Sequence, residues 1–80
     1  MQYIGKCPIC KGYGMLEAVI SEKNGNCSIL CEECFTEWNN PEDALKNRNG
    51  YRDRSFKDRI RSASLDEVTK AGWDKYIINL

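Results

Sequence analysis

Cys7-Pro8-Ile9-Cys10 and Cys31-Glu32-Glu33-Cys34 are the two most informative stretches of this sequence. Two residues separate the cysteines within each pair, and twenty residues separate the pairs. A two-residue gap lets one tight turn direct both sulfurs toward one ion, and two such turns complete a tetrahedral shell. The sequence therefore predicts a structural zinc ion as cofactor, with these ligands: Cys7, Cys10, Cys31 and Cys34.

The compartment and the cysteine count favour metal binding over the alternatives, which are disulfides and a redox-active dithiol. We find neither a run of eighteen apolar residues nor a secretory signal pattern, so we expect a cytoplasmic chain that does not enter the membrane. Thiols stay reduced in the cytoplasm, and five cysteines is an odd number for a disulfide framework. Cys27 is left over. It is an alternative to Cys31 as a ligand, but its spacing suits a turn less well, and we interpret it as a small core residue.

An 80-residue chain forms at most one domain and buries little apolar surface, so the metal is expected to replace part of a core. Residues 13–20 and 27–30 have the apolar character of strands, and Asn24-Gly25 between them is a strong hairpin signal. The hairpin would bring the second cysteine pair opposite the first. This arrangement predicts a small α+β fold, a zinc ribbon in which a β-hairpin carries two metal-binding turns.

Two short helices and a docked carboxy-terminal segment are expected to follow the ribbon. Asn40-Pro41 predicts a helix start, and the helix would run to about Arg48 before Asn49-Gly50. Ser64-Leu65-Asp66-Glu67 is a capping box, with Leu65, Val68 and Ala71 facing inward and Gly72 at the helix end. The apolar residues after Gly72 predict a strand or extended segment on the ribbon. We therefore expect one domain over residues 1–80, with a ribbon at 1–38 and an extension at 39–80. The aromatic residues Phe35 and Trp38 are expected to cover the metal site.

The composition argues against an enzyme. The chain has no histidine, the commonest general base and a common ligand of catalytic zinc. Four thiolates also fill the coordination shell of zinc and leave no position for a reacting water. We therefore expect a structural metal and a binding function.

A net charge of zero conceals two segments of opposite charge. Residues 1–45 carry three basic and seven acidic side chains, whereas residues 46–61 carry seven basic and two acidic ones. The acidic segment is either a solvated surface or a face for a basic partner protein, such as a nuclease with a positive cleft. The candidate partner contacts lie close to the second cysteine pair: Glu32, Glu33, Glu37, Trp38, Glu42 and Asp43.

The basic segment gives the alternative function, in which a ribbon binds nucleic acid. A solvated loop that pairs internally through Asp53 and Asp58 is the competing interpretation. The neutral total charge counts against binding nucleic acid. The candidate residues for this alternative are Arg48, Arg52, Arg54, Lys57 and Arg59.

The motifs also resemble those of a known class of proteins. Cys7-Pro8-x-Cys10, then Cys31-x-x-Cys34-Phe35 with Glu37-Trp38 and Pro41-Glu42-Asp43, is similar to the small cysteine-rich ribbons among bacterial immunity proteins. The tail motifs Ser64-Leu65-Asp66-Glu67, Ala71-Gly72-Trp73 and Tyr76-Ile77 are similar to a tail that recurs in that class. In contact-dependent growth inhibition and related systems, such a protein binds a cognate toxin domain and blocks its active site. The resemblance therefore implies an immunity protein with a toxin, expected to be a nuclease, as partner.

Overall fold

An antiparallel sheet lies at the centre of the computed structural model, which describes residues 2–10, 13–22, 24–52 and 60–78. Its strands are β1 (Tyr3–Lys6), β2 (Met15–Ser21), β3 (Cys27–Cys31), β4 (Glu37–Trp38) and β5 (Ile60–Ser62). The helices are α1 (Pro41–Leu45), α2 (Leu65–Lys70) and the 3-10 helix η1 (Asp74–Tyr76). The predicted small α+β fold with an antiparallel hairpin and two short α-helices is confirmed for the described residues.

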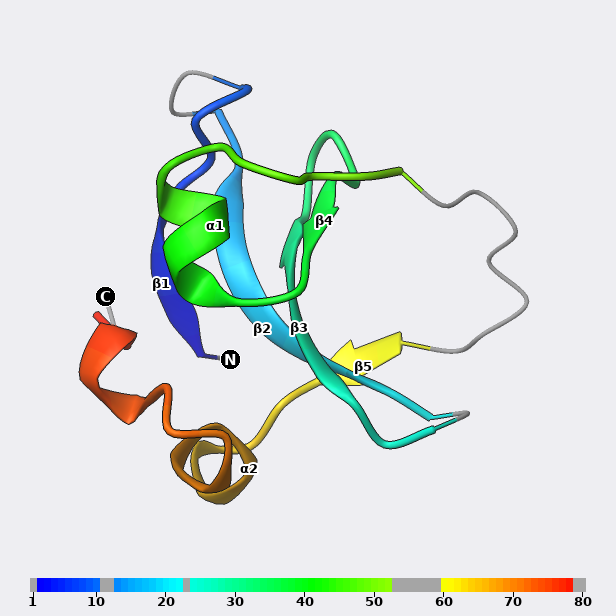
Figure 1. Cartoon of the computed structure of the whole chain (residues 1–80), viewed down its shortest axis with the longest axis vertical. Helices are drawn as coiled ribbons and strands as arrows, with labels where there is room; N and C mark the ends of the chain where they lie inside the picture. The colour runs from blue at the N-terminus through cyan, green and yellow to red at the C-terminus, as the bar shows by residue number, and fades with distance from the viewer. Residues whose placement is uncertain (1, 11–12, 23, 53–59, 79–80) are drawn as a thin grey trace.

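β2 is the strand that connects the others (Figure 1). It pairs with β3 along one edge, in a register that runs from Leu16 opposite Cys31 to Ile20 opposite Cys27. Its other edge is shared, because β1 pairs with the first half of β2 and β5 pairs with the second half. β4 then continues the sheet beyond β3. β2 is therefore enclosed on both edges, and its five central residues are buried.

The turn between β2 and β3 forms where Asn24-Gly25 predicts it. Gly25 has a φ of 74°, in the left-handed region that a glycine adopts without steric cost. Its N–H donates to the Ser21 carbonyl at 2.8 Å, and the Ser21 N–H donates to the Asn26 carbonyl at 3.0 Å. The hairpin is confirmed, although β2 begins at Met15, two residues later than expected.

The hydrophobic core lies between the sheet and the helices. Its largest fully buried side chains include Leu16, Ile29, Trp38 and Val68. The same cluster contains Cys7 and Cys31, so the thiols of the two turns are part of the core. A chain of this length has few apolar residues to spare, and the cysteines extend its interior to one end of the sheet.

Both α-helices begin and end with side-chain or backbone caps. The Asn40 side chain accepts a hydrogen bond from the Asp43 N–H, and Pro41 begins α1 as predicted. α1 ends at Leu45, however, and not near Arg48. Asn47 adopts a left-handed φ of 52°, and the Arg48 N–H donates back to the Asp43 carbonyl at 2.8 Å. Asn47 therefore occupies the capping position that we assigned to Asn49-Gly50.

α2 has the predicted capping box, in which Ser64 and Glu67 bond to each other's backbone N–H groups. Gly72 ends the helix with a φ of 79°, also as predicted. The expectation of three inward residues was wrong, because only Val68 is buried, whereas Leu65 is 51% exposed and Ala71 is exposed. A helix of six residues presents a single position to the core here.

The carboxy-terminal segment is docked, but it is not a strand. It forms η1, and Trp73, Tyr76 and Ile77 pack against the core cluster. The Ile78 N–H donates to the Tyr3 carbonyl at 2.9 Å, which ties the segment to β1. Our prediction of an extended segment on the ribbon is therefore correct in its docking and wrong in its conformation.

Residues 46–52, the described start of the basic segment, are turns and loop rather than helix. Tyr51 exchanges backbone hydrogen bonds with Glu37 of β4, and Ile60 begins β5, which pairs with β2. Residues 53–59 between them lie outside the described part of the chain.

The turn after β1 and the turn between β3 and β4 lie at the same end of the sheet, whereas α2 lies at the opposite end (Figure 1). The sheet thus brings the two cysteine pairs together, as the hairpin argument predicts. No helix in the described part of the chain has both the length and the apolar character of a membrane span.

Candidate metal centre

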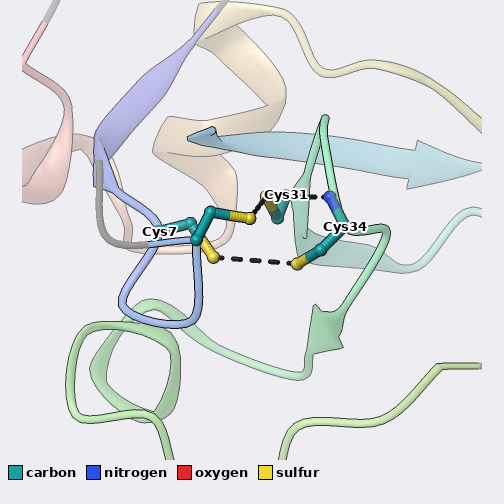
Figure 2. Close-up of side chains that lie close together, drawn as sticks. Cys7, Cys31 and Cys34 are labelled. Atoms are coloured by element: carbon teal, nitrogen blue, oxygen red, sulfur yellow. Dashed lines mark hydrogen bonds between the residues drawn. The ribbon is translucent and has the colours of Figure 1, made fainter. Parts of the chain in front are cut away.

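The four predicted ligand cysteines lie together at the end of the sheet. Their sulfurs are all within 4.8 Å of one another. The Sγ atoms of Cys7 and Cys34 are 3.8 Å apart, and those of Cys10 and Cys31 are 3.6 Å apart. Figure 2 shows the sulfurs of Cys7, Cys31 and Cys34 pointing toward one another from the two turns. The cysteines are free thiols, since a disulfide would hold two sulfurs at about 2.05 Å. This set can coordinate one metal ion.

Backbone hydrogen bonds at the ends of the strands close both turns. The Cys7 N–H donates to the Gly14 carbonyl at 2.8 Å, and the Cys31 N–H donates to the Thr36 carbonyl at 3.0 Å. The second turn is also joined to the start of β2, because the Glu32 N–H donates to the Met15 carbonyl at 3.3 Å. The sheet therefore fixes the separation of the two cysteine pairs.

Gly14, just before β2, lies close against the second turn. A Cβ at this position would lie 2.5 Å from the Sγ of Cys31 and 3.0 Å from the Cβ of Glu33. Both distances are shorter than ordinary contacts, so the site has room for glycine alone here. Sequence reasoning missed this residue, because the contact spans two strands and leaves no local signal.

Hydrogen-bond donors reach the sulfurs of the second turn. The Sγ of Cys31 accepts from the backbone N–H groups of Glu33 and Cys34, both at 3.4 Å. The Sγ of Cys34 lies 3.2 Å from the hydroxyl of Thr36, a residue that is 3% exposed. Such bonds stabilise a thiolate, the form that binds metal.

The thiols differ in how readily they ionise. Burial, followed by hydrogen bonding to Cys34, raises the pKa of Cys10 to about 12. Burial also acts to raise the pKa of Cys34, but the hydrogen bonds from Thr36 and from the neighbouring thiols outweigh it and lower this pKa to about 6. Of Cys10 and Cys34, Cys34 is therefore the thiol that ionises first. A metal ion that binds here has to displace a proton from Cys10.

Cys27 lies outside the cluster of four. It is half-buried on β3 and packs against the core. Burial, with a smaller effect of the Glu67 charge, raises its pKa to about 11. These observations fit the interpretation as a small core residue and give it no place among the ligands.

The two aromatic residues that we expected to cover the site have different roles. Trp38 is completely buried in the core between the sheet and the helices. Its assignment as a partner contact is therefore wrong, because the side chain does not reach the surface. Phe35 is 52% exposed and adopts a left-handed φ of 60°, which is costly for a residue other than glycine.

The acidic candidates fall into two groups. Glu32 and Glu33 are exposed, and neither forms an ion pair with a described residue. The others have partners within the chain. Glu37 accepts a hydrogen bond from Ser28 at 2.7 Å. Glu42 pairs with Lys46 and Arg48. Asp43 pairs with Arg48 and accepts a hydrogen bond from the side-chain amide of Asn40, the N-cap of α1. Among the five acidic candidates, only the two acids within the second turn form no ion pair or side-chain hydrogen bond with a described residue.

The basic candidates are only partly described. Arg48 pairs with Glu42 and Asp43, and Arg52 donates from its Nε to Thr36 at 3.1 Å. Arg54, Lys57 and Arg59 lie outside the described residues. The two described arginines therefore bond within the chain, and nothing about them favours nucleic acid.

Exposed apolar side chains near the turns were not among the sequence-based candidates. Ile9, between the first two cysteines, is 38% exposed, and Tyr13, just after that turn, is 89% exposed. Ile9 and Tyr13 therefore add exposed apolar surface within and just after the first cysteine pair. The sequence signal that could have identified Ile9 and Tyr13 is their position within and just after the first cysteine pair.

Comparison of the chain with models of protein families, with curated proteins and with solved structures finds no match. What the site can do is therefore inferred from its own residues.

Proposed function

We propose that the four cysteines hold a structural zinc ion in a zinc ribbon. Tetrahedral coordination at a Zn–S distance of about 2.3 Å requires sulfurs about 3.8 Å apart. The sulfurs of Cys7 and Cys34, at 3.8 Å, and those of Cys10 and Cys31, at 3.6 Å, already have about this spacing. Zinc bound by four thiolates has no open position, so its role is to fix the two turns rather than to react with a substrate.

We propose further that the chain is an immunity protein, which neutralises a cognate bacterial toxin by covering its active site. The observation that carries this proposal is the pair of exposed carboxylates, Glu32 and Glu33, on a turn that the proposed zinc ion would hold; neither carboxylate forms an ion pair with a described residue. Fixed negative charges speed association with a positive active-site cleft, and a rigid turn loses little entropy on binding. A nuclease is the class of toxin that has such a cleft.

The partner surface in this proposal includes apolar groups as well as acids. Ile9, Tyr13 and Phe35 are exposed and lie within or beside the two turns. Apolar and aromatic groups supply most of the affinity of a protein interface once they lose their water, whereas rim charges mainly set the rate of association. Trp38, Glu37 and Asp43 support the fold in this arrangement.

The test is co-expression with the product of the neighbouring reading frame, with growth and complex formation as readouts. Glu32→Lys and Glu33→Lys should slow association and reduce protection. Glu22→Lys is the matched control, since Glu22 is an exposed acid at the hairpin turn, at the other end of β2. Zinc content should stay at one ion per chain in all variants. Full protection by both charge-reversal variants of the second turn, at unchanged association rates, would contradict the proposed surface.

A further inference from the structure

Thr36 forms a hydrogen-bonded link between the metal centre and a cation on another segment. Its hydroxyl lies 3.2 Å from the Sγ of Cys34 and 3.1 Å from the Nε of Arg52. Thr36 is buried, whereas Arg52 is exposed apart from this contact. Arg52 is one of the candidates for a nucleic-acid surface, but its guanidinium bonds to Thr36, beside the cysteines.

The direction of both hydrogen bonds is fixed by chemistry. A guanidinium group only donates, so Thr36 accepts from Arg52. A metal-bound thiolate has no proton and only accepts, so Thr36 donates its single O–H to Cys34. The chain therefore has a defined sequence of donors that runs from Arg52 through Thr36 to Cys34.

Local packing holds this link in place. Tyr51 exchanges backbone hydrogen bonds of 2.7 and 2.9 Å with Glu37, so residues 50–52 lie beside β4. A Cβ on Gly50 would lie 3.0 Å from the Cγ2 of Thr36 and 2.7 Å from the Nε1 of Trp38. The absence of a side chain at Gly50 lets the segment approach closely enough for Arg52 to reach the hydroxyl.

We propose that Arg52 and Thr36 are positioning residues of the metal centre, which hold the Cys34 thiolate on the metal and slow its release. This inference rests on the proposed metal centre. Four thiolates around a divalent ion carry a net charge of −2, and a nearby cation offsets part of it. Among the described residues, the other donors to the sulfurs are backbone N–H groups, and only Thr36 connects a sulfur to a charged side chain.

Metal transfer to an excess of a chromophoric chelator tests the proposal on the full chain. Thr36→Val keeps the shape of the side chain and removes the hydroxyl, and it should speed metal loss by about 10-fold or more, as loss of an outer hydrogen bond does elsewhere. Thr36→Ser should restore nearly the original rate. Arg52→Gln should have a smaller effect in the same direction. Arg48→Gln is the control, because it removes an equal charge that pairs with Glu42 and Asp43 instead.

Cobalt spectra separate this role from a general loosening of the fold. Removing a donor from a thiolate raises the energy of its electrons, so the sulfur-to-cobalt band of the Thr36→Val variant should move to longer wavelength. The Thr36→Ser and Arg48→Gln variants should keep the original band. Metal loss at the original rate from both the Thr36→Val and Arg52→Gln variants would overturn the inference and leave the metal centre intact. A wild-type chain that binds no cobalt would overturn the metal centre itself.

Discussion

Replacing Gly14 with alanine should damage the proposed metal centre without altering any of its four cysteines. The added Cβ would lie 2.5 Å from the Sγ of Cys31, where ordinary contact begins at 3.4 Å. The sulfur must therefore move by about 1 Å, whereas metal–ligand distances tolerate only about 0.2 Å. Structural zinc sites have apparent binding free energies of about 10–16 kcal/mol, so weakening one of four ligands costs about 3 kcal/mol. We expect zinc affinity to fall about 100-fold.

Competition with a chelator of known affinity measures this loss, and the intensity of the cobalt spectrum reports whether the site stays tetrahedral. Gly25→Ala is the matched control. Gly25 has a left-handed φ of 74° and no atom within 4 Å of the added Cβ, so the cost is about 1 kcal/mol of backbone strain. It should lower stability and leave zinc affinity unchanged. Unaltered zinc affinity in the Gly14→Ala variant would refute the packing argument.

Three further predictions concern the metal, Cys27 and the ion pair of α2. Removing the metal with a chelator should open both turns and lower the unfolding temperature, seen by circular dichroism, because binding free energy contributes to folding; an unchanged temperature would contradict this. Cys27→Ala should keep the four-sulfur cobalt spectrum, and a three-sulfur spectrum would make Cys27 a ligand. The hydrogen bonds from Arg61, followed by those of Ser64, lower the pKa of Glu67 to about 2, below its usual 4.5. The contribution of the Glu67 carboxylate to the free energy of unfolding is therefore fully present above about pH 4.5. It is lost as the pH falls toward about 2. The difference in unfolding free energy between the wild type and Glu67→Gln should be constant from about pH 7 to about pH 5 in urea titrations, and a decrease there would contradict the lowered pKa.

The sequence was sufficient to predict the parts of the fold that depend on local chemistry. Asn24-Gly25 specifies a tight turn, and Ser64 and Glu67 specify a capping box, because each motif satisfies backbone groups only a few residues away. The spacing of the cysteines likewise predicts which four sulfurs meet. The end of α1 was placed too late because either Asn47 or Asn49 can take the left-handed conformation, and both do so.

The parts that depend on contacts between distant segments were not predictable from local patterns. We predicted that Trp38 contacts a partner, because no local pattern shows that residues of the later helices bury it. The contact of Gly14 with Cys31 and the link from Arg52 to Thr36 join residues that are sixteen or more positions apart. Such contacts arise from strand pairing, which the composition of each segment does not specify.

The pairing of Leu16 with Cys31 has a consequence for how the chain reaches its native state. Neighbouring positions of a strand face opposite sides of a sheet, so a slip of one residue between β2 and β3 would turn Cys31 away from the other three sulfurs. A misaligned hairpin would then offer an incomplete set of ligands and bind metal weakly. In the proposed zinc ribbon, the ion would therefore act as a check on strand alignment, because it would stabilise only the hairpin in which all four thiols converge.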